Sequence, residues 1–143
     1  MTKYVVGFMF NEKKDKVLLI RKNRPKWQKG RLNGVGGHIE EYDLNENQAM
    51  IREFREETNI LHYGWKHFAN IIRNNYDDKD YNVYFYYSIS DIMYEYENAT
   101  DEVIEIVSLD SFPRNDVIYN LNWLIFIALD KSVVEPVIVY DVG

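Results

Sequence analysis

The sequence predicts an α/β fold in which a mixed β-sheet lies between helices (α/β/α), and three observations support this. Strand-like runs outnumber helical ones, several follow one another as hairpins would, and two segments have helical composition or spacing. The chain has 143 residues, 46% of them hydrophobic and 15% aromatic, so it can build a core unaided. We therefore expect residues 1–143 to form a single domain.

The first part of the chain is predicted to be a hairpin followed by a loop. Residues 4–10 and 16–21 are rich in β-branched and aromatic side chains, and a polar, turn-like segment separates them. Residues 22–37 are rich in Lys, Arg, Asn and Gly, which is typical of a loop. The second strand therefore leads into a long glycine-containing connection.

A first helix is predicted over residues 44–58, which contain Glu, Gln, Ala, Met and Arg but no Gly or Pro. Asp43 or Asn45 can cap its start. Asn59 can supply the left-handed residue that commonly ends a helix.

The second half of the chain alternates between strands and one further helix. Apolar residues recur at helical spacing in one segment, and the other segments are β-branched or aromatic. We expect strands over 67–72, 81–89 and 103–109, a helix over 116–129, and a last strand over 133–140 that Pro136 interrupts.

Composition and charge exclude several classes of protein. The absence of cysteine excludes disulfide scaffolds, thiolate zinc sites, iron–sulfur clusters and cysteine nucleophiles. A formal charge of −6 argues against binding to a nucleic-acid polymer. We see no signal peptide and no apolar run long enough to span a bilayer, so we expect a cytoplasmic protein without a membrane partner. The sequence carries no signal for the oligomeric state.

The strongest chemical signal is the run from Arg52 to Glu57, Arg-Glu-Phe-Arg-Glu-Glu. On a helix Glu53, Glu56 and Glu57 share one face within an arc of about 100°. Their charges repel one another, so the face needs a neutralising cation, and Mg²⁺ prefers such carboxylate oxygens. The alternative is a solvated acidic face of a surface helix. Arg52 can pair with Glu56 or reach back to Asp43.

This run, a short distance after a Gly-Gly loop, resembles the Nudix hydrolase signature G-x5-E-x7-R-E-U-x-E-E-x-G-U, in which U is bulky and apolar. The matching positions are Gly37, Arg52, Glu53, Phe54, Glu56, Glu57 and Ile60. Three positions depart from the pattern. Asp43 stands in place of the first Glu, eight residues instead of seven precede Arg52, and Asn59 replaces the last Gly.

The resemblance implies hydrolysis of a nucleoside diphosphate linked to another group, with Mg²⁺ or Mn²⁺ as cofactor. The implied metal ligands are Glu53, Glu56, Glu57 and the Gly36 carbonyl, and Arg52 would hold the motif together. Many members add a Glu from another loop, as a ligand or base. Glu102, just before a predicted strand, is our candidate, and the alternative is that it is one more solvated acid.

Residues 31–40 look like the corresponding segment of the branch that hydrolyses oxidised purine nucleoside triphosphates. The implied substrate-binding residues are Asn33, Trp27, Asn120 and Gly37. Asn33 would pair with the base, Trp27 would line the pocket, and Asn120 falls near an acidic base-reading position. Asn33 could instead be a turn residue, and Trp27 a lid or core residue.

The sequence therefore predicts a Mg²⁺-dependent pyrophosphohydrolase that converts a nucleoside triphosphate to a monophosphate and pyrophosphate. Two alternatives remain. One is hydrolysis of ADP-ribose, a nucleotide sugar or a dinucleoside polyphosphate, and the other is a regulatory domain that binds nucleotides without turnover. Five cations between residues 22 and 31 form either a phosphate-steering rim or a solvated loop: Lys22, Arg24, Lys26, Lys29 and Arg31.

Overall fold

The computed structural model describes residues 1–142, and Gly143, the last residue of the predicted domain, lies outside the described residues. Strands and helices alternate along the chain as the sequence predicts. In chain order they are β1 (Thr2–Phe10), β2 (Lys16–Arg21), β3 (Leu32–Asn33), β4 (Val35–His38), α1 (Glu46–Thr58), β5 (Lys66–Arg73), β6 (Tyr81–Ile89), the 3-10 helix η1 (Asp91–Glu95), β7 (Val103–Ser108), the 3-10 helix η2 (Leu109–Ser111), α2 (Leu121–Leu129) and β8 (Val137–Tyr140).

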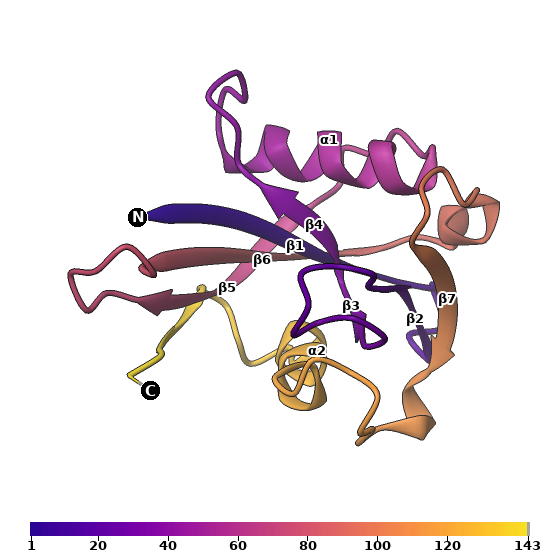
Figure 1. Cartoon of the computed structure of the whole chain (residues 1–143). Helices are drawn as coiled ribbons and strands as arrows, with labels where there is room; N and C mark the ends of the chain where they lie inside the picture. The colour runs from indigo at the N-terminus through magenta and orange to yellow at the C-terminus, as the bar shows by residue number, and fades with distance from the viewer. Residues whose placement is uncertain (143) are drawn as a thin grey trace.

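The strands form one mixed sheet with the order β3-β2-β1-β6-β5-β8. β1 lies near its centre and pairs in parallel with β6 along its whole length, from Thr2 opposite Tyr81 to Phe10 opposite Ile89. The other long edge of β1 is shared by two antiparallel partners, β4 and β2. β7 continues the sheet beyond β2 (Figure 1).

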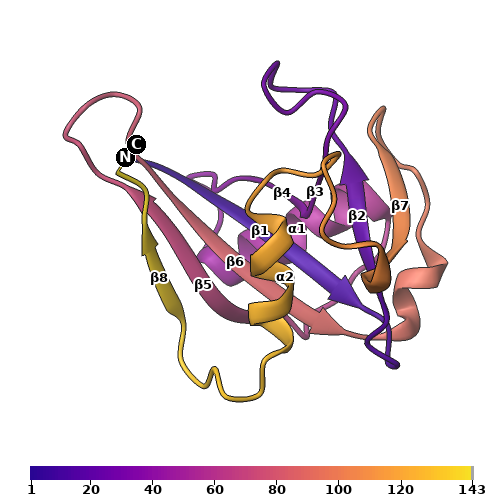
Figure 2. The ribbon, with the colours of Figure 1, turned by 90° about the horizontal axis from the view of Figure 1, so that it is seen from below.

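The two helices cover opposite faces of the sheet (Figures 1 and 2). Side chains alternate across each strand, so β1 supplies both cores. Its Phe8 and Phe10 pack on the α2 side, whereas Val5 and Met9 pack on the α1 side with Phe54. The predicted arrangement of a mixed sheet between helices is confirmed.

The caps of α1 explain where it begins and ends. The Asn45 side chain accepts a hydrogen bond from the Gln48 backbone N–H at 2.9 Å, so Asn45 is the N-cap. Asn59 has φ 60° and its N–H donates to the Arg55 carbonyl, as a left-handed C-terminal residue does. The predicted end at Thr58 and the Asn45 and Asn59 caps are confirmed, whereas the helix begins at Glu46, two residues later than predicted, and Asp43 is not its cap.

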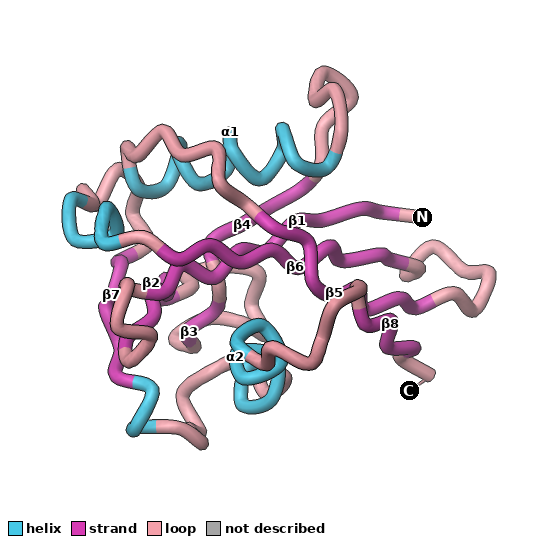
Figure 3. The backbone as a smooth tube through the Cα atoms, turned by 180° about the vertical axis from the view of Figure 1, so that it is seen from behind, coloured by secondary structure: helices cyan, strands magenta, loops and turns pink. Residues whose placement is uncertain are grey.

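Two predicted segments differ from the structure. The loop expected over 22–37 contains β3 and β4, and the helix expected over 116–129 begins only at Leu121. β3 pairs with β2 and β4 pairs with β1. Helix α2 starts late because residues 116–118 are held beside β3. The Leu32 N–H donates to the Asp116 carbonyl at 2.8 Å, and the Ile118 N–H donates to the Leu32 carbonyl at 2.9 Å. The chain from η2 to α2 is therefore loop (Figure 3).

The last strand covers only Val137–Tyr140, directly after Pro136, since proline cannot donate to a strand ladder. Among residues 1–142, no helix combines the length and apolar character that crossing a bilayer requires.

Candidate metal and nucleotide site

The Glu53 side chain is the most buried carboxylate on α1, with 8% of the residue exposed. It lies against Gly37 of β4, where a Cβ on residue 37 would be 2.5 Å from Glu53 Oε1. Burial raises the pKa of Glu53 to about 7, the nearby Arg52 charge opposes this rise, and the Glu56 and Glu57 charges add to it. The absence of a side chain on Gly37 thus makes room for the Glu53 carboxyl group in a largely desolvated position.

Arg52 ties the start of α1 to the segment before it. Its guanidinium donates to both Asp43 oxygens, at 2.8 and 2.9 Å, and to the His38 carbonyl at 3.0 Å. It also bonds Glu53 at 3.1 Å and Glu56 at 3.2 Å. The Arg52 hydrogen bonds lower the pKa of Asp43. The eight-residue spacing therefore still lets Asp43 reach Arg52.

Glu57 is half-buried, and the Thr100 hydroxyl donates to its carboxylate at 2.8 Å. Desolvation raises the pKa of Glu57, and the charge of the nearby Glu102 raises it further. Glu56, by contrast, is exposed. The face of α1 thus carries three carboxylates that range from buried to exposed.

These carboxylates fit a divalent cation. Glu53 and Glu57 are desolvated and repel their acidic neighbours, and a bound cation would relieve both penalties. Within residues 1–142, no three acidic or histidine side chains already surround one point as ligands would. Glu53 and Glu56 both accept hydrogen bonds from Arg52 Nη1, at 3.1 and 3.2 Å. Gly36 lies beside Gly37 in β4, which packs on α1.

Glu102 is buried, with only 3% exposed, so it is not a solvated acid. Its carboxylate forms an ion pair with Lys22 Nζ at 2.9 Å and accepts the Asn23 backbone N–H. It lies close enough to Glu57 for their charges to interact. The structure thus places Glu102 beside the acidic face of α1, with its oxygens already engaged.

Trp27 lies within the 22–31 connection, and Asn33 lies in β3 directly after it. The Asn33 amide nitrogen donates to Gln28 Oε1 at 3.2 Å, and its oxygen accepts the Gly34 N–H at 2.8 Å. Trp27 is 64% exposed and therefore does not belong to the core. Gln28 was not singled out by the sequence, because a lone Gln in a loop carries no pattern.

Asn120 stands at the start of α2 but its side chain does not cap the helix. Its Oδ1 is buried and has no hydrogen-bond partner among the described residues. The bridge between Leu32 and Val117 brings this part of the chain beside β3, which carries Asn33. The structure therefore brings together the segments that carry Asn33 and Asn120.

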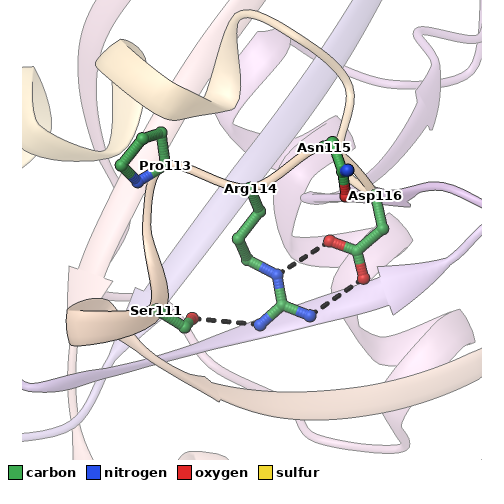
Figure 4. A pocket seen from close by; sticks show the side chains of 5 residues that line it. All are labelled: Ser111, Pro113, Arg114, Asn115 and Asp116. Carbon is green, nitrogen blue, oxygen red and sulfur yellow. Dashed lines mark hydrogen bonds and ion pairs between the residues drawn. The ribbon is translucent and has the colours of Figure 1, made fainter.

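An open hollow in the segment before α2 is lined by Ser111, Pro113, Arg114, Asn115 and Asp116 (Figure 4). The Arg114 nitrogens are all engaged, two with Asp116 and one with Ser111. Asp116 also pairs with Arg21. This arginine is therefore committed to the fold, and the hollow presents no free guanidinium to a phosphate.

The five cations between residues 22 and 31 fall into two groups, two that form ion pairs and three that do not form any with residues 1–142. Lys22 pairs with Glu102 and Arg24 with Asp101. Lys26, Lys29 and Arg31 are exposed and form no ion pair with any of residues 1–142. Only these three remain to attract an anion.

Comparison with known proteins agrees with the fold and the motif. A family model described as NUDIX domain matches residues 1–126. The Nudix domain of Shewanella oneidensis NrtR, complexed with ADP ribose, superposes with a TM-score of 0.71 at 18% identity, over 89% of this chain and 85% of that chain. A NUDIX-family hydrolase from Clostridium perfringens gives a TM-score of 0.65 at 20% identity, over 90% of this chain and 95% of that chain. The MutT protein from Bacillus halodurans gives 0.65 at 15% identity, over 98% and 87%.

At these identities the superpositions establish the fold. A search of curated proteins finds no match. The family model, however, spans most of the chain and includes the whole acidic motif. This chain therefore belongs to the Nudix family.

Proposed function

We propose that this protein is a divalent-metal-dependent hydrolase that converts a nucleoside triphosphate and water to a nucleoside monophosphate and pyrophosphate. One observation carries the proposal. The desolvated Glu53 carboxylate lies against Gly37 with Glu57 on the same helix face, an arrangement that is unfavourable without a cation. Structural acids are not usually kept in this state, whereas functional ones often are.

Glu53, Glu56 and Glu57 would hold Mg²⁺ or Mn²⁺, together with the Gly36 carbonyl. When bound, the cation would polarise the phosphoanhydride and neutralise charge that develops on the leaving pyrophosphate. A carboxylate of the same face would accept the proton from the attacking water. Arg52 would not touch substrate, since its nitrogens hold Asp43, His38 and the acidic face.

The nucleotide would lie between the acidic face and the segments that carry Asn33 and Asn120. The unpartnered Asn120 Oδ1 would accept a donor from the base. Trp27, exposed in the 22–31 connection, would stack on the base. Gly37 would serve by letting Glu53 approach.

The test is a screen for pyrophosphate and monophosphate release with Mg²⁺ over ordinary and oxidised nucleoside triphosphates, ADP-ribose and dinucleoside polyphosphates. We expect turnover of a triphosphate that falls by about 100-fold or more in Glu57→Gln. The matched control is Glu12→Gln, because Glu12 is an exposed acid in the β1–β2 turn. A Glu57→Gln variant as active as the wild type would overturn the proposal.

A second candidate is hydrolysis of ADP-ribose, a nucleotide sugar or a dinucleoside polyphosphate. It is favoured by the two hydrogen bonds that already engage the Asn33 amide nitrogen and oxygen within the protein, which leave one N–H and one oxygen lone pair for a purine. The similar fold of the NrtR Nudix domain, which binds ADP ribose, points the same way. Turnover confined to these substrates in the same screen would favour this candidate.

The eight-residue spacing in the motif raised the alternative of a domain that binds nucleotides without turnover. The structure removes that particular reason, because Asp43 still binds Arg52 through both oxygens. Tight metal-dependent nucleotide binding with no product release would nevertheless establish a regulatory role.

A further inference from the structure

Glu102 makes an unusually complete set of contacts for an acid beside a metal site. Its Oε1 pairs with Lys22 Nζ at 2.9 Å, and its Oε2 accepts the Asn23 backbone N–H and, at 3.4 Å, that of Arg24. The Lys22 side chain is itself only 16% exposed. If Glu102 turned toward a metal ion, it would leave a largely buried ammonium without its partner.

Asp101, the residue before Glu102, also bonds residues at the start of the 22–31 connection. Asp101 pairs with the Arg24 guanidinium, and its carbonyl accepts the Asn23 side-chain amide at 2.8 Å. Two consecutive acidic residues therefore hold three consecutive residues at the start of the 22–31 connection. We refer to Asp101 and Glu102 as the acidic clasp and to residues 22–31 as the recognition loop.

The other side of the clasp is fixed to the end of α1. The Thr100 hydroxyl donates to Glu57 at 2.8 Å and accepts the Glu102 N–H at 3.2 Å. The Glu97 N–H donates to the Thr58 carbonyl at 3.0 Å. The segment from 97 to 102 thus lies between Glu57 and the recognition loop and contacts both.

The recognition loop contacts Asn33 through a hydrogen bond. Lys22 closes the base of the loop, because its N–H donates to the Arg31 carbonyl and its carbonyl accepts the Gly30 N–H, at 2.9 and 2.8 Å. Within the loop, Gln28 accepts the Asn33 amide. Lys22 therefore anchors the base of the loop that carries both the exposed Trp27 and Gln28, the partner of Asn33.

We propose that Glu102 is a positioning residue, which holds the recognition loop through Lys22 and Asn23 at a fixed place relative to Glu57. This inference rests on the proposed function for its link to substrate. It assigns Glu102 to nucleotide binding in place of the metal-ligand or base role that the motif resemblance implies. In this role Lys22 neutralises Glu102 and does not attract the phosphates of a substrate.

The first experiment compares Glu102→Gln, Lys22→Met, the double variant and the control Glu12→Gln in KM, kcat and Mn²⁺ affinity. Gln at 102 still accepts the Asn23 N–H but loses its attraction for Lys22. We expect Glu102→Gln to raise KM about tenfold, with kcat and the Mn²⁺ dissociation constant changed by less than about threefold. Lys22→Met should do the same, and the double variant should lose less than both single effects combined, since no unpaired charge remains.

Mn²⁺ binding that weakens in Glu102→Gln as much as in Glu57→Gln would overturn the inference. A large loss of kcat at unchanged KM would do so as well, since it would indicate a ligand or base.

A second readout does not need turnover. Amide hydrogen exchange should become faster in residues 23–31 of Glu102→Gln, while residues 53–57 stay unchanged. Unchanged exchange in the recognition loop would contradict the inference even in an active enzyme. If the wild type releases no product from any nucleotide, the proposed function fails, and the exchange and Mn²⁺ measurements still decide the role of Glu102.

Discussion

The carboxylate of Glu53 fills the space that a side chain on Gly37 would need: the distance from a Cβ at residue 37 would be 2.5 Å to Glu53 Oε1 and 2.7 Å to its Cδ. Gly37→Ala therefore pushes the carboxylate out of place while leaving its charge. Under the proposed function we expect kcat/KM to fall about 10- to 100-fold, because small displacements of a group in a catalytic site have large effects. The free energy of unfolding should fall by about 1 to 3 kcal/mol.

Gly64→Ala is the matched control for this variant. A Cβ at residue 64 would lie 3.0 Å from the end of the His62 ring and 3.7 Å from the Ser88 hydroxyl, and none of its three nearest atoms belongs to an acidic residue of α1. Its activity should stay close to that of the wild type. A Gly37→Ala enzyme with full activity would show that the position of Glu53 does not matter for turnover.

The acidic face of α1 could be predicted from the sequence because its residues are close together in the chain. Glu53, Glu56 and Glu57 share a helix, and helical geometry alone puts them on one side. The cap residues Asn45 and Asn59 were predictable for the same reason, since capping is local chemistry.

The partners of Glu102 were not predictable, because about 80 residues separate it from Lys22 and Asn23. Only the pairing of β2 with β7 brings them together. The short strands β3 and β4 escaped prediction for a similar reason. Gly36 carries no strand signal, yet a Cβ there would lie 1.9 Å from the Val5 carbonyl oxygen, so glycine is what allows β4 to approach β1.

Asp116 should make stability depend on pH in the acid range. The hydrogen bond from Arg114, aided by the Arg21 charge, lowers the pKa of Asp116 to about 2 from an ordinary value of 3.8. A lowered pKa in the folded protein means that the stabilisation is present above pH 3.8 and is lost as the pH falls toward 2. Because the side chain is one third exposed, we expect Asp116→Asn to lose about 1 kcal/mol at neutral pH.

Urea unfolding at neutral pH and at about pH 2 checks this prediction. The difference between wild type and Asp116→Asn should shrink toward zero at the lower pH. Asp110→Asn is the control, because Asp110 is exposed and its carboxylate has no ion pair with any residue from 1 to 142. A difference that stays constant with pH would mean that Asp116 acts by packing instead of charge.

Asn59 replaces the last glycine of the motif, and two variants separate its backbone role from its side-chain role. Its φ of 60° is strained for most residues, and its amide donates to Glu97 at 2.7 Å. We expect Asn59→Ala to lower the free energy of unfolding by about 1 to 2 kcal/mol, since alanine loses the amide and is disfavoured in this conformation. Asn59→Gly should stay within about 0.5 kcal/mol of the wild type, because the relief of strain offsets the lost hydrogen bond. Thermal unfolding measures both, and an alanine variant as stable as the glycine variant would contradict the backbone role.

Asp43→Glu restores the residue type of the motif, yet we expect it to destabilise the protein. The Asp43 side chain is almost fully buried, holds Arg52 through both oxygens and accepts the Glu40 N–H at 2.8 Å. An added methylene has no room in this arrangement and should lower the free energy of unfolding by about 1 to 3 kcal/mol.

Deletion of Leu44 in the same variant restores the seven-residue spacing as well. Leu44 is 88% exposed, so its loss removes no core contact. We expect the shorter connection to shift the backbone of residue 43 and so to accommodate the longer Glu side chain. We expect the combined variant to be more stable than Asp43→Glu alone and to keep the wild-type KM. If Asp43→Glu alone is as stable as the wild type, the shorter acid and the extra residue are independent changes and do not compensate each other.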